Sequence, residues 1–194
     1  MDAEDSFHLQ LAKSIQAWLW IEAELYSLYS MFMQGANSHL ISATFNNIQS
    51  IDAKLALLNS CFTLVFERGS EDIKNWKVFF GKLEKLNKQR NKIVHEPVSL
   101  HYKKGVLHEI KLGPSYSNSL ALTKGQTTHQ GKPVVSADYD PSKVYILEDH
   151  RLTQNGVAAL EATFKATALE LRGYREAIAP KVSAALKAAH KPRP

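Results

Sequence analysis

Apolar residues recur at every third or fourth position along the first part of the chain. Between Phe7 and Phe32, the apolar positions include Leu11, Ile15, Trp18, Ile21, Leu25 and Leu28. This spacing gathers side chains on one face of an α-helix. The pattern predicts a helix over residues 7–33 that ends near Gly35, because glycine often follows a helix C-terminus.

Two further apolar stripes follow. The first predicts one continuous helix over residues 38–67, ended by Arg68 and Gly69; its apolar positions are Ile41, Phe45, Ile48, Ile51, Leu55, Leu58, Phe62 and Val65. Ser70 then stands in N-cap position, ahead of two acidic residues that suit a helix N-terminus. A third helix is predicted over residues 71–96, bounded by Pro97, with the apolar positions Ile73, Trp76, Phe80, Leu83 and Leu86.

The residue pattern and composition change after Pro97. Residues 99–112 alternate around Lys103-Lys104-Gly105 as a hairpin does, and the stretch up to Leu147 is rich in Gly, Ser, Thr and Pro. We therefore expect a small β-containing insertion over residues 98–148. Thr153 is a suitable N-cap for a fourth helix over residues 153–178, which should end before Pro180. The basic C-terminal tail over residues 179–194 is expected to form a loose helix rich in Ala and Lys.

Together these elements predict a mainly α fold, a bundle of about four main helices with the β-containing insertion between the third and the fourth. The chain has 194 residues, of which 44% are hydrophobic, enough for a single domain over residues 1–178. It has no apolar run of about 18 residues, and the first ten residues contain acids but no Lys or Arg. We expect a soluble, cytoplasmic protein that does not bind membranes.

The single cysteine limits the kinds of disulfide and metal site that the chain can form. Cys61 has no intrachain partner, which excludes an internal disulfide framework and a cysteine-cluster zinc site, and its apolar surroundings indicate a small buried side chain. The histidines outside residues 90–95 show no metal-ligand spacing. No metal or cofactor is therefore expected.

The end of the third predicted helix combines an inward arginine with a polar row. Arg90 and Val94 continue the apolar stripe, so the guanidinium should face a carboxylate, an anion-binding cleft or another subunit. Asn87, Asn91 and His95 are spaced four apart and form an adjoining row. A histidine near a helix C-terminus can exchange protons near neutral pH, and an arginine beside it can neutralise a phosphate.

Basic residues surround this segment. The formal net charge is +5, and one basic group lies along the third predicted helix: Lys74, Lys77, Lys82, Lys85, Lys88, Arg90 and Lys92. A second group lies at the C-terminus: Lys181, Lys187, Lys191 and Arg193. The first group is interpreted either as a nucleic-acid footprint or as an ordinary solvated helix face. On the first interpretation Asn87, Lys88 and Lys92 would bind substrate.

The run Arg90-Asn91-Lys92-Ile93-Val94-His95 resembles the RNxxxH motif of the HEPN superfamily, a group of compact helical bundles found in bacterial toxins, defence systems and RNA-processing enzymes. The resemblance covers residues 7–97 and the helix after Thr153, and the insertion lies outside the minimal bundle. It implies a metal-independent endoribonuclease with Arg90, Asn91 and His95 as catalytic residues. It also implies a homodimer with facing motifs, RNA as a partner, and a possible antitoxin or partner protein.

An alternative function is a non-catalytic module of the same type, in which the polar residues bind a nucleotide or hold subunits together. Other charged residues, Glu22, Glu24, Asp52 and Lys54, are interpreted as helix-surface charges, although one of them could pair with Arg90. The tryptophans are expected to be core anchors rather than base-stacking platforms, with Trp20 off the main stripe.

Overall fold

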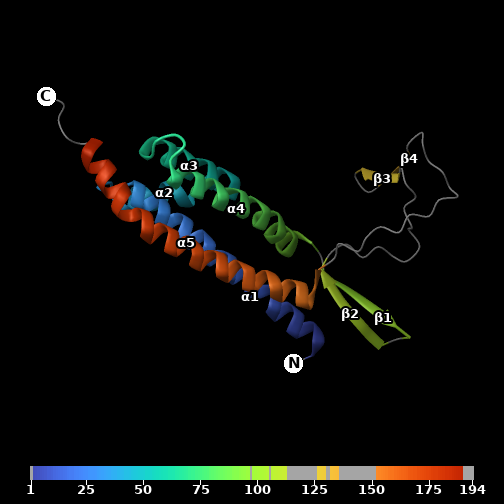
Figure 1. Cartoon of the computed structure of the whole chain (residues 1–194). Helices are drawn as coiled ribbons and strands as arrows, with labels where there is room; N and C mark the ends of the chain where they lie inside the picture. The colour runs from blue at the N-terminus through green and yellow to red at the C-terminus, as the bar shows by residue number, and fades with distance from the viewer. Residues whose placement is uncertain are drawn as a thin grey trace. The chain divides into compact units, whose positions relative to one another are not determined.

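The computed structural model describes residues 2–96, 98–104, 106–112, 126–129, 132–135 and 152–189. These residues form α1 (Ala3–Phe32), α2 (Ser38–Asn46), α3 (Ile51–Val65), α4 (Glu71–His95) and α5 (Gln154–Ala189). They also form β1 (Val98–Lys103), β2 (Val106–Leu112), β3 (Gln126–His129), β4 (Lys132–Val135) and β5 (Leu152–Thr153). Figure 1 shows the helices and strands in chain order. The expectation of a mainly α fold with a β-containing insertion before the last long helix is confirmed.

The chain forms two compact units, one of residues 1–95 and 154–194 and the other of residues 96–153. The first unit holds all five described helices, and the second holds the described strands. Among the described helices, none carries an apolar stretch long enough to cross a bilayer.

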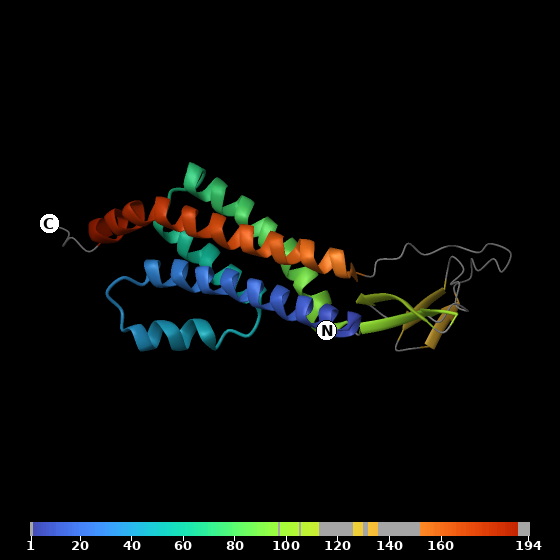
Figure 2. The same cartoon turned by 90° about the horizontal axis from the view of Figure 1, so that it is seen from below.

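In the helical unit, α1 and α5 run side by side in the same direction (Figures 1 and 2). The contacts between them advance together along both helices, from Ser6 with Gln154 to Glu24 with Arg172. Helix α4 runs the opposite way, because its first turn contacts the later part of α5 through Asp72 and Tyr174.

The core lies where α1, α3, α4 and α5 meet. The buried ring of Phe62 on α3 stacks on Trp76 of α4 with centroids 4.5 Å apart, and packs edge-on against Phe32 of α1 at 4.9 Å. Tyr174 of α5 also stacks on Phe62, with ring centroids 6.0 Å apart. Aromatic pairs of this geometry stabilise a core beyond their buried area. The apolar stripes of the sequence thus meet at one cluster.

Helix boundaries follow local capping chemistry. Asp2 and Asn37 accept hydrogen bonds from backbone amides at the starts of α1 and α2, and Ser70 does so at the start of α4, as predicted. Gly35 and Gly69 adopt positive φ angles of 89° and 86° after α1 and α3. Glycine tolerates this conformation, so both turns are sharp.

Two helix predictions were wrong in extent. The continuous helix expected over residues 38–67 is two helices, α2 and α3, separated by residues 47–50. Helix α2 packs Phe45 against Tyr26 and Tyr29 of α1, and the chain must then turn before α3 can run along α1. The last helix does not end before Pro180 but passes through it to Ala189. Ile178 and Val182, on either side of the proline, are both buried.

The β unit contains the expected hairpin. Strands β1 and β2 pair antiparallel, with Lys103 opposite Val106, and Lys104 in the turn has a φ angle of 53°. Strand β5 pairs with the end of β2 through Lys111 and Leu112, giving the strand order β1-β2-β5. Strands β3 and β4 form a separate antiparallel pair. The rest of the predicted insertion lies outside the described residues.

Candidate functional site

The last two turns of α4 carry the predicted site residues. His95 is the final residue of α4, as expected, and its side chain is exposed, like that of Asn91. Lys88 and Lys92 share this outer side of the helix, with Lys88 exposed and Lys92 half-buried. Pro97, the predicted boundary, lies outside the described residues. The two lysines, the asparagine and the histidine thus follow one surface of α4.

Arg90 lies on the inner side of α4, as its phase predicted. It falls between the buried residues Leu86 and Ile93, and its side chain is half-buried. The prediction that Val94 continues the inward stripe was wrong, because Val94 is 39% exposed and Ile93 is buried in its place. A drift of this kind is expected when spacings of four accumulate on a helix with 3.6 residues per turn.

The guanidinium of Arg90 is only partly bonded. Its Nη1 donates a hydrogen bond of 3.2 Å to Asn91 Oδ1. Its Nε is buried and has no hydrogen-bond partner. Among the described residues no carboxylate forms an ion pair with Arg90, so the pairing considered with Glu22, Glu24, Asp52 or Lys54 is not found. A charged donor is therefore left with unused hydrogen-bonding capacity.

Arg90 and His95 are five residues apart, which places them about 140° apart around the helix axis. Asn91 stands between them: it accepts the bond from Arg90 and lies one turn before His95. Asn87 takes no part in this group. It is buried, and its Nδ2 donates a hydrogen bond of 3.2 Å to Asp52 Oδ1 at the start of α3. The predicted polar row is thus split between a structural asparagine and two exposed residues.

Sequence reasoning missed two buried charge clusters. Glu24 of α1 is only 6% exposed and accepts hydrogen bonds from Arg172 Nε at 2.8 Å and Arg175 Nε at 3.1 Å. Lys54 of α3 is 8% exposed, and its Nζ lies 3.1 Å from Glu22 Oε2. The interpretation of Glu24 and Lys54 as helix-surface charges was wrong. Both follow inward helical spacing, the same signal that identified Arg90.

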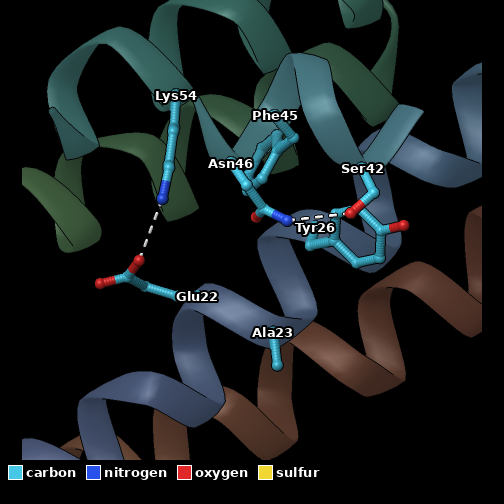
Figure 3. Close-up of a pocket in the computed structure, with 7 residues that line it drawn as sticks. All are labelled: Glu22, Ala23, Tyr26, Ser42, Phe45, Asn46 and Lys54. Carbon is cyan, nitrogen blue, oxygen red and sulfur yellow. Dashed lines mark hydrogen bonds and ion pairs between the residues drawn. The ribbon is translucent and has the colours of Figure 1, made fainter. Parts of the chain in front are cut away.

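The Lys54–Glu22 pair lines a pocket of about 270 Å³ between α1, α2 and α3. Figure 3 shows Lys54 reaching toward Glu22, with Asn46 bonded to Ser42 at the opposite wall. The Lys54 ammonium also lies 5.1 Å from the centroid of the Phe45 ring, an attractive cation–π geometry. Glu22 additionally accepts a bond of 2.8 Å from Trp18 Nε1. The pocket has room for a small polar molecule, and its charged pair is electrically balanced.

The basic group on α4 is partly neutralised. Lys74 pairs with Glu71 at 3.7 Å, and Lys82 pairs with Glu170 of α5 at 2.5 Å. Lys77 and Lys85 are exposed. In the C-terminal group, Lys181 pairs with Asp72, and Lys191 and Arg193 lie outside the described residues. Among the described residues, the positive charge of α4 that pairs with no carboxylate therefore lies mostly in the C-terminal half of the helix.

The described residues contain neither an exposed cysteine nor a cluster of metal-binding side chains. Cys61 is buried, as expected, and burial raises the pKa of its thiol. Within the described part of the chain, no three His, Cys, Asp or Glu side chains gather closely enough to hold a metal ion. The chemistry of the α4 group thus rests on a histidine, an asparagine and an arginine.

Comparison with known proteins adds no family assignment: no protein-family model, curated protein or solved structure matches this chain.

Proposed function

We propose that the chain is a metal-independent endoribonuclease of HEPN type, with His95, Arg90 and Asn91 at its active site. The observation that carries the proposal is the buried, unpartnered Nε of Arg90 beside the Nη1–Asn91 bond. A half-buried guanidinium without a carboxylate is costly unless an anion satisfies it in use. The phosphodiester of an RNA chain is an anion of suitable geometry for a guanidinium fork.

The proposed reaction uses the substrate's own 2′-hydroxyl. His95 removes the 2′ proton as the 2′ oxygen attacks phosphorus, and the bond from phosphorus to the 5′ oxygen breaks. The leaving oxygen takes up a proton, so the products are a 2′,3′-cyclic phosphate and a free 5′-hydroxyl. Arg90 stabilises the extra negative charge on the phosphorane, and Asn91 holds the guanidinium in place.

A homodimer would supply the second proton-transfer group. One subunit offers one exposed His95, whereas the reaction needs both a base and an acid. In a C2 pair with facing α4 ends, two copies of His95 would share one cleft. Exposed Val94 lies beside His95 and supports an apolar contact between subunits at this end of α4. A toxin role with a neutralising partner protein is a biological setting that agrees with this proposal.

Cleavage of pooled RNA in the presence of EDTA tests the proposal. The wild-type chain should cut RNA without added metal, leave 2′,3′-cyclic phosphate ends, and spare DNA, which lacks the 2′-hydroxyl. His95→Ala should lower the rate by about 10²- to 10⁴-fold, the usual contribution of one acid–base group. Arg90→Ala should lose activity to a comparable degree.

Lys85→Gln is a matched control, because Lys85 is an exposed basic residue of the same helix outside the site. It should retain nearly full activity with an unchanged melting temperature. A strict requirement for Mg²⁺, or full activity in His95→Ala, would overturn the mechanism.

The second candidate function is a non-catalytic module for assembly or nucleotide binding. It is favoured by one observation, the tie between buried Asn87 and Asp52, which makes part of the predicted polar row structural. In this case wild-type protein should leave RNA intact. Arg90→Ala and His95→Ala should instead dissociate subunits, as measured by light scattering, or weaken binding of a nucleotide.

A further inference from the structure

A basic and aromatic strip lies along the seam between α1 and α5. It consists of Trp20 from α1 and Lys165, Leu169, Arg172 and Arg175 from α5. Figures 1 and 2 show the two helices running side by side, and Lys165 Nζ lies 5.6 Å from the centroid of the Trp20 ring. Lys165 Nζ also forms an ion pair of 2.5 Å with Glu161 Oε1 on the preceding turn of α5. Positions 165, 169 and 172 have spacings of four and three, so they share one face of α5. The strip therefore presents a continuous surface.

The two arginines of the strip are oriented by a buried carboxylate. Glu24 receives one Nε donor from each of them, so both guanidinium groups are anchored by a single negative charge. Among the described residues, the Nη groups of Arg172 have no acceptor, and this side chain is 56% exposed. Arg175 makes one further, longer ion pair of 3.9 Å with Glu176. An anchored guanidinium with free Nη donors is well suited to hold a phosphate.

Trp20 differs from the other tryptophans of the chain. Trp18 and Trp76 are buried in the core, as expected, but Trp20 is 47% exposed. Leu169, on the neighbouring face of α5, is also exposed, at 64%. A partly exposed indole beside a cation is an arrangement that proteins use to stack unpaired bases.

The spacing of the strip fits a short stretch of strand. Lys165 and Arg172 are seven residues apart, which is roughly 10 Å along the helix axis. Trp20 precedes Glu24 by one helical turn, so the indole and the anchored arginines lie in successive turns of the seam. A base on Trp20 and a neighbouring phosphate on Arg172 could therefore come from the same oligonucleotide. Duplex bases are stacked on each other and cannot offer a face to the indole.

We propose that this strip binds single-stranded nucleic acid, with one base stacked on Trp20 and a phosphate held by the Nη groups of Arg172 and Arg175. The proposal does not depend on cleavage, because every group involved lies outside the α4 residues assigned to catalysis. It applies equally if the chain is a non-catalytic module.

Titration of the full-length chain with a short oligodeoxythymidine tests the proposal without any possibility of 2′-hydroxyl cleavage. Binding should quench the fluorescence of Trp20, and the Trp20→Phe variant should bind but lose most of the quenching. Trp20→Ala should weaken binding by about 5- to 150-fold, which is the effect of removing one base–aromatic stack. The same sequence as a duplex should bind much more weakly.

Charge variants test the phosphate contact. Arg172→Gln should reduce the slope of log affinity against log salt by about 0.7, the value for one phosphate contact on a single strand. Lys165→Gln should reduce it by less, because Glu161 already neutralises part of the Lys165 charge. Lys103→Gln, at an exposed lysine at the end of β1, is the control and should leave affinity and slope unchanged. Because Arg172→Gln removes one of the two arginines that pair with buried Glu24, the melting temperature of this variant is measured in parallel. If Arg172→Gln unfolds, Lys165→Gln and Trp20→Ala decide the test.

Three outcomes would overturn the proposal. The first is unchanged affinity in Trp20→Ala. The second is an equal loss in Lys165→Gln and Lys103→Gln, which would indicate diffuse attraction by net charge. The third is displacement of the oligonucleotide by polyglutamate at equal charge concentration, which would indicate an acidic protein partner instead.

Discussion

The side-chain amide of Asn87 donates a hydrogen bond of 3.2 Å to the carboxylate of Asp52, and so fastens the later part of α4 to the first turn of α3. Asn87 lies three residues before Arg90, slightly less than one helical turn, so this bond fixes the part of α4 that carries the candidate site. Substrate binding had been expected of Asn87. Its burial and its partner indicate that it positions α4 instead.

Asn87→Ala should therefore lower stability. Loss of the bond should cost about 1 kcal/mol in the free energy of unfolding. In a double-mutant cycle with Asp52→Ala, the two losses should be less than additive, because either substitution removes the same bond. Urea denaturation measures both. Strict additivity, or a loss of RNA binding with unchanged stability, would return Asn87 to a substrate-binding role.

The helices could be predicted from the sequence because their apolar spacing is a local property. The break at residues 47–50 could not, since Phe45, Ile48 and Ile51 keep a spacing of three across it. The cause is tertiary: Phe45 packs on Tyr26 and Tyr29 of α1, and no spacing rule reveals that contact.

Pro180 gives the opposite case, a local signal overridden by packing. A proline inside a helix costs about 3 kcal/mol, yet Ile178 and Val182 are both buried when the helix continues. For the candidate site, helical phase predicted correctly that Arg90 points inward. It could not say what Arg90 meets, because phase gives a direction but no neighbour, and the same limit hid the partners of Glu24 and Lys54.

The Lys54–Glu22 pair should contribute to stability mainly because each partner neutralises a partly buried charge on the other. Lys54→Met leaves the partly buried Glu22 carboxylate without its cation, and should cost about 1 to 3 kcal/mol. The double variant Lys54→Met with Glu22→Gln should recover part of this loss, since no lone charge remains and Gln can still accept from Trp18 Nε1.

Lys74→Met is the matched control for this pair. Lys74 and Glu71 form an exposed ion pair at 3.7 Å, and its removal should change stability by no more than about 0.5 kcal/mol. Thermal and urea unfolding of the four chains provide the comparison. Equal effects of the Lys54 and Lys74 variants would show that burial adds nothing to the pair.

Truncation after Ala179 should destabilise the helical unit. The deleted segment includes Val182, which is fully buried, and Lys181, which bonds to Asp72 of α4 at 2.7 Å. Burial of one valine side chain alone is worth about 1.5 kcal/mol or more. Truncation after Ala189 keeps every described contact and should shift stability by less than about 0.5 kcal/mol. If both truncations unfold at the same urea concentration, the helix beyond Pro180 does not contribute to the core.

The stability of the chain at alkaline pH should depend on Tyr174. Its hydroxyl donates a hydrogen bond of 2.9 Å to the backbone carbonyl of Asp72, and burial together with the Asp72 charge raises the pKa of the phenol. A phenol whose pKa is higher in the folded chain than in the unfolded chain stabilises the fold. This contribution is complete below the unfolded pKa of about 10 and is lost as pH rises further.

Tyr174→Phe keeps the ring contacts with Phe62 and Phe79. The free energy of unfolding of this variant should be about 1 kcal/mol lower than that of the wild type below pH ~9, and should decline less steeply above that pH. Burial also raises the pKa of Tyr29 and Cys61, but both are present in the two chains, so their effects cancel in the difference. Urea denaturation across this pH range measures the two curves, and parallel curves would show that Tyr174 ionises as freely in the folded chain as in the unfolded one.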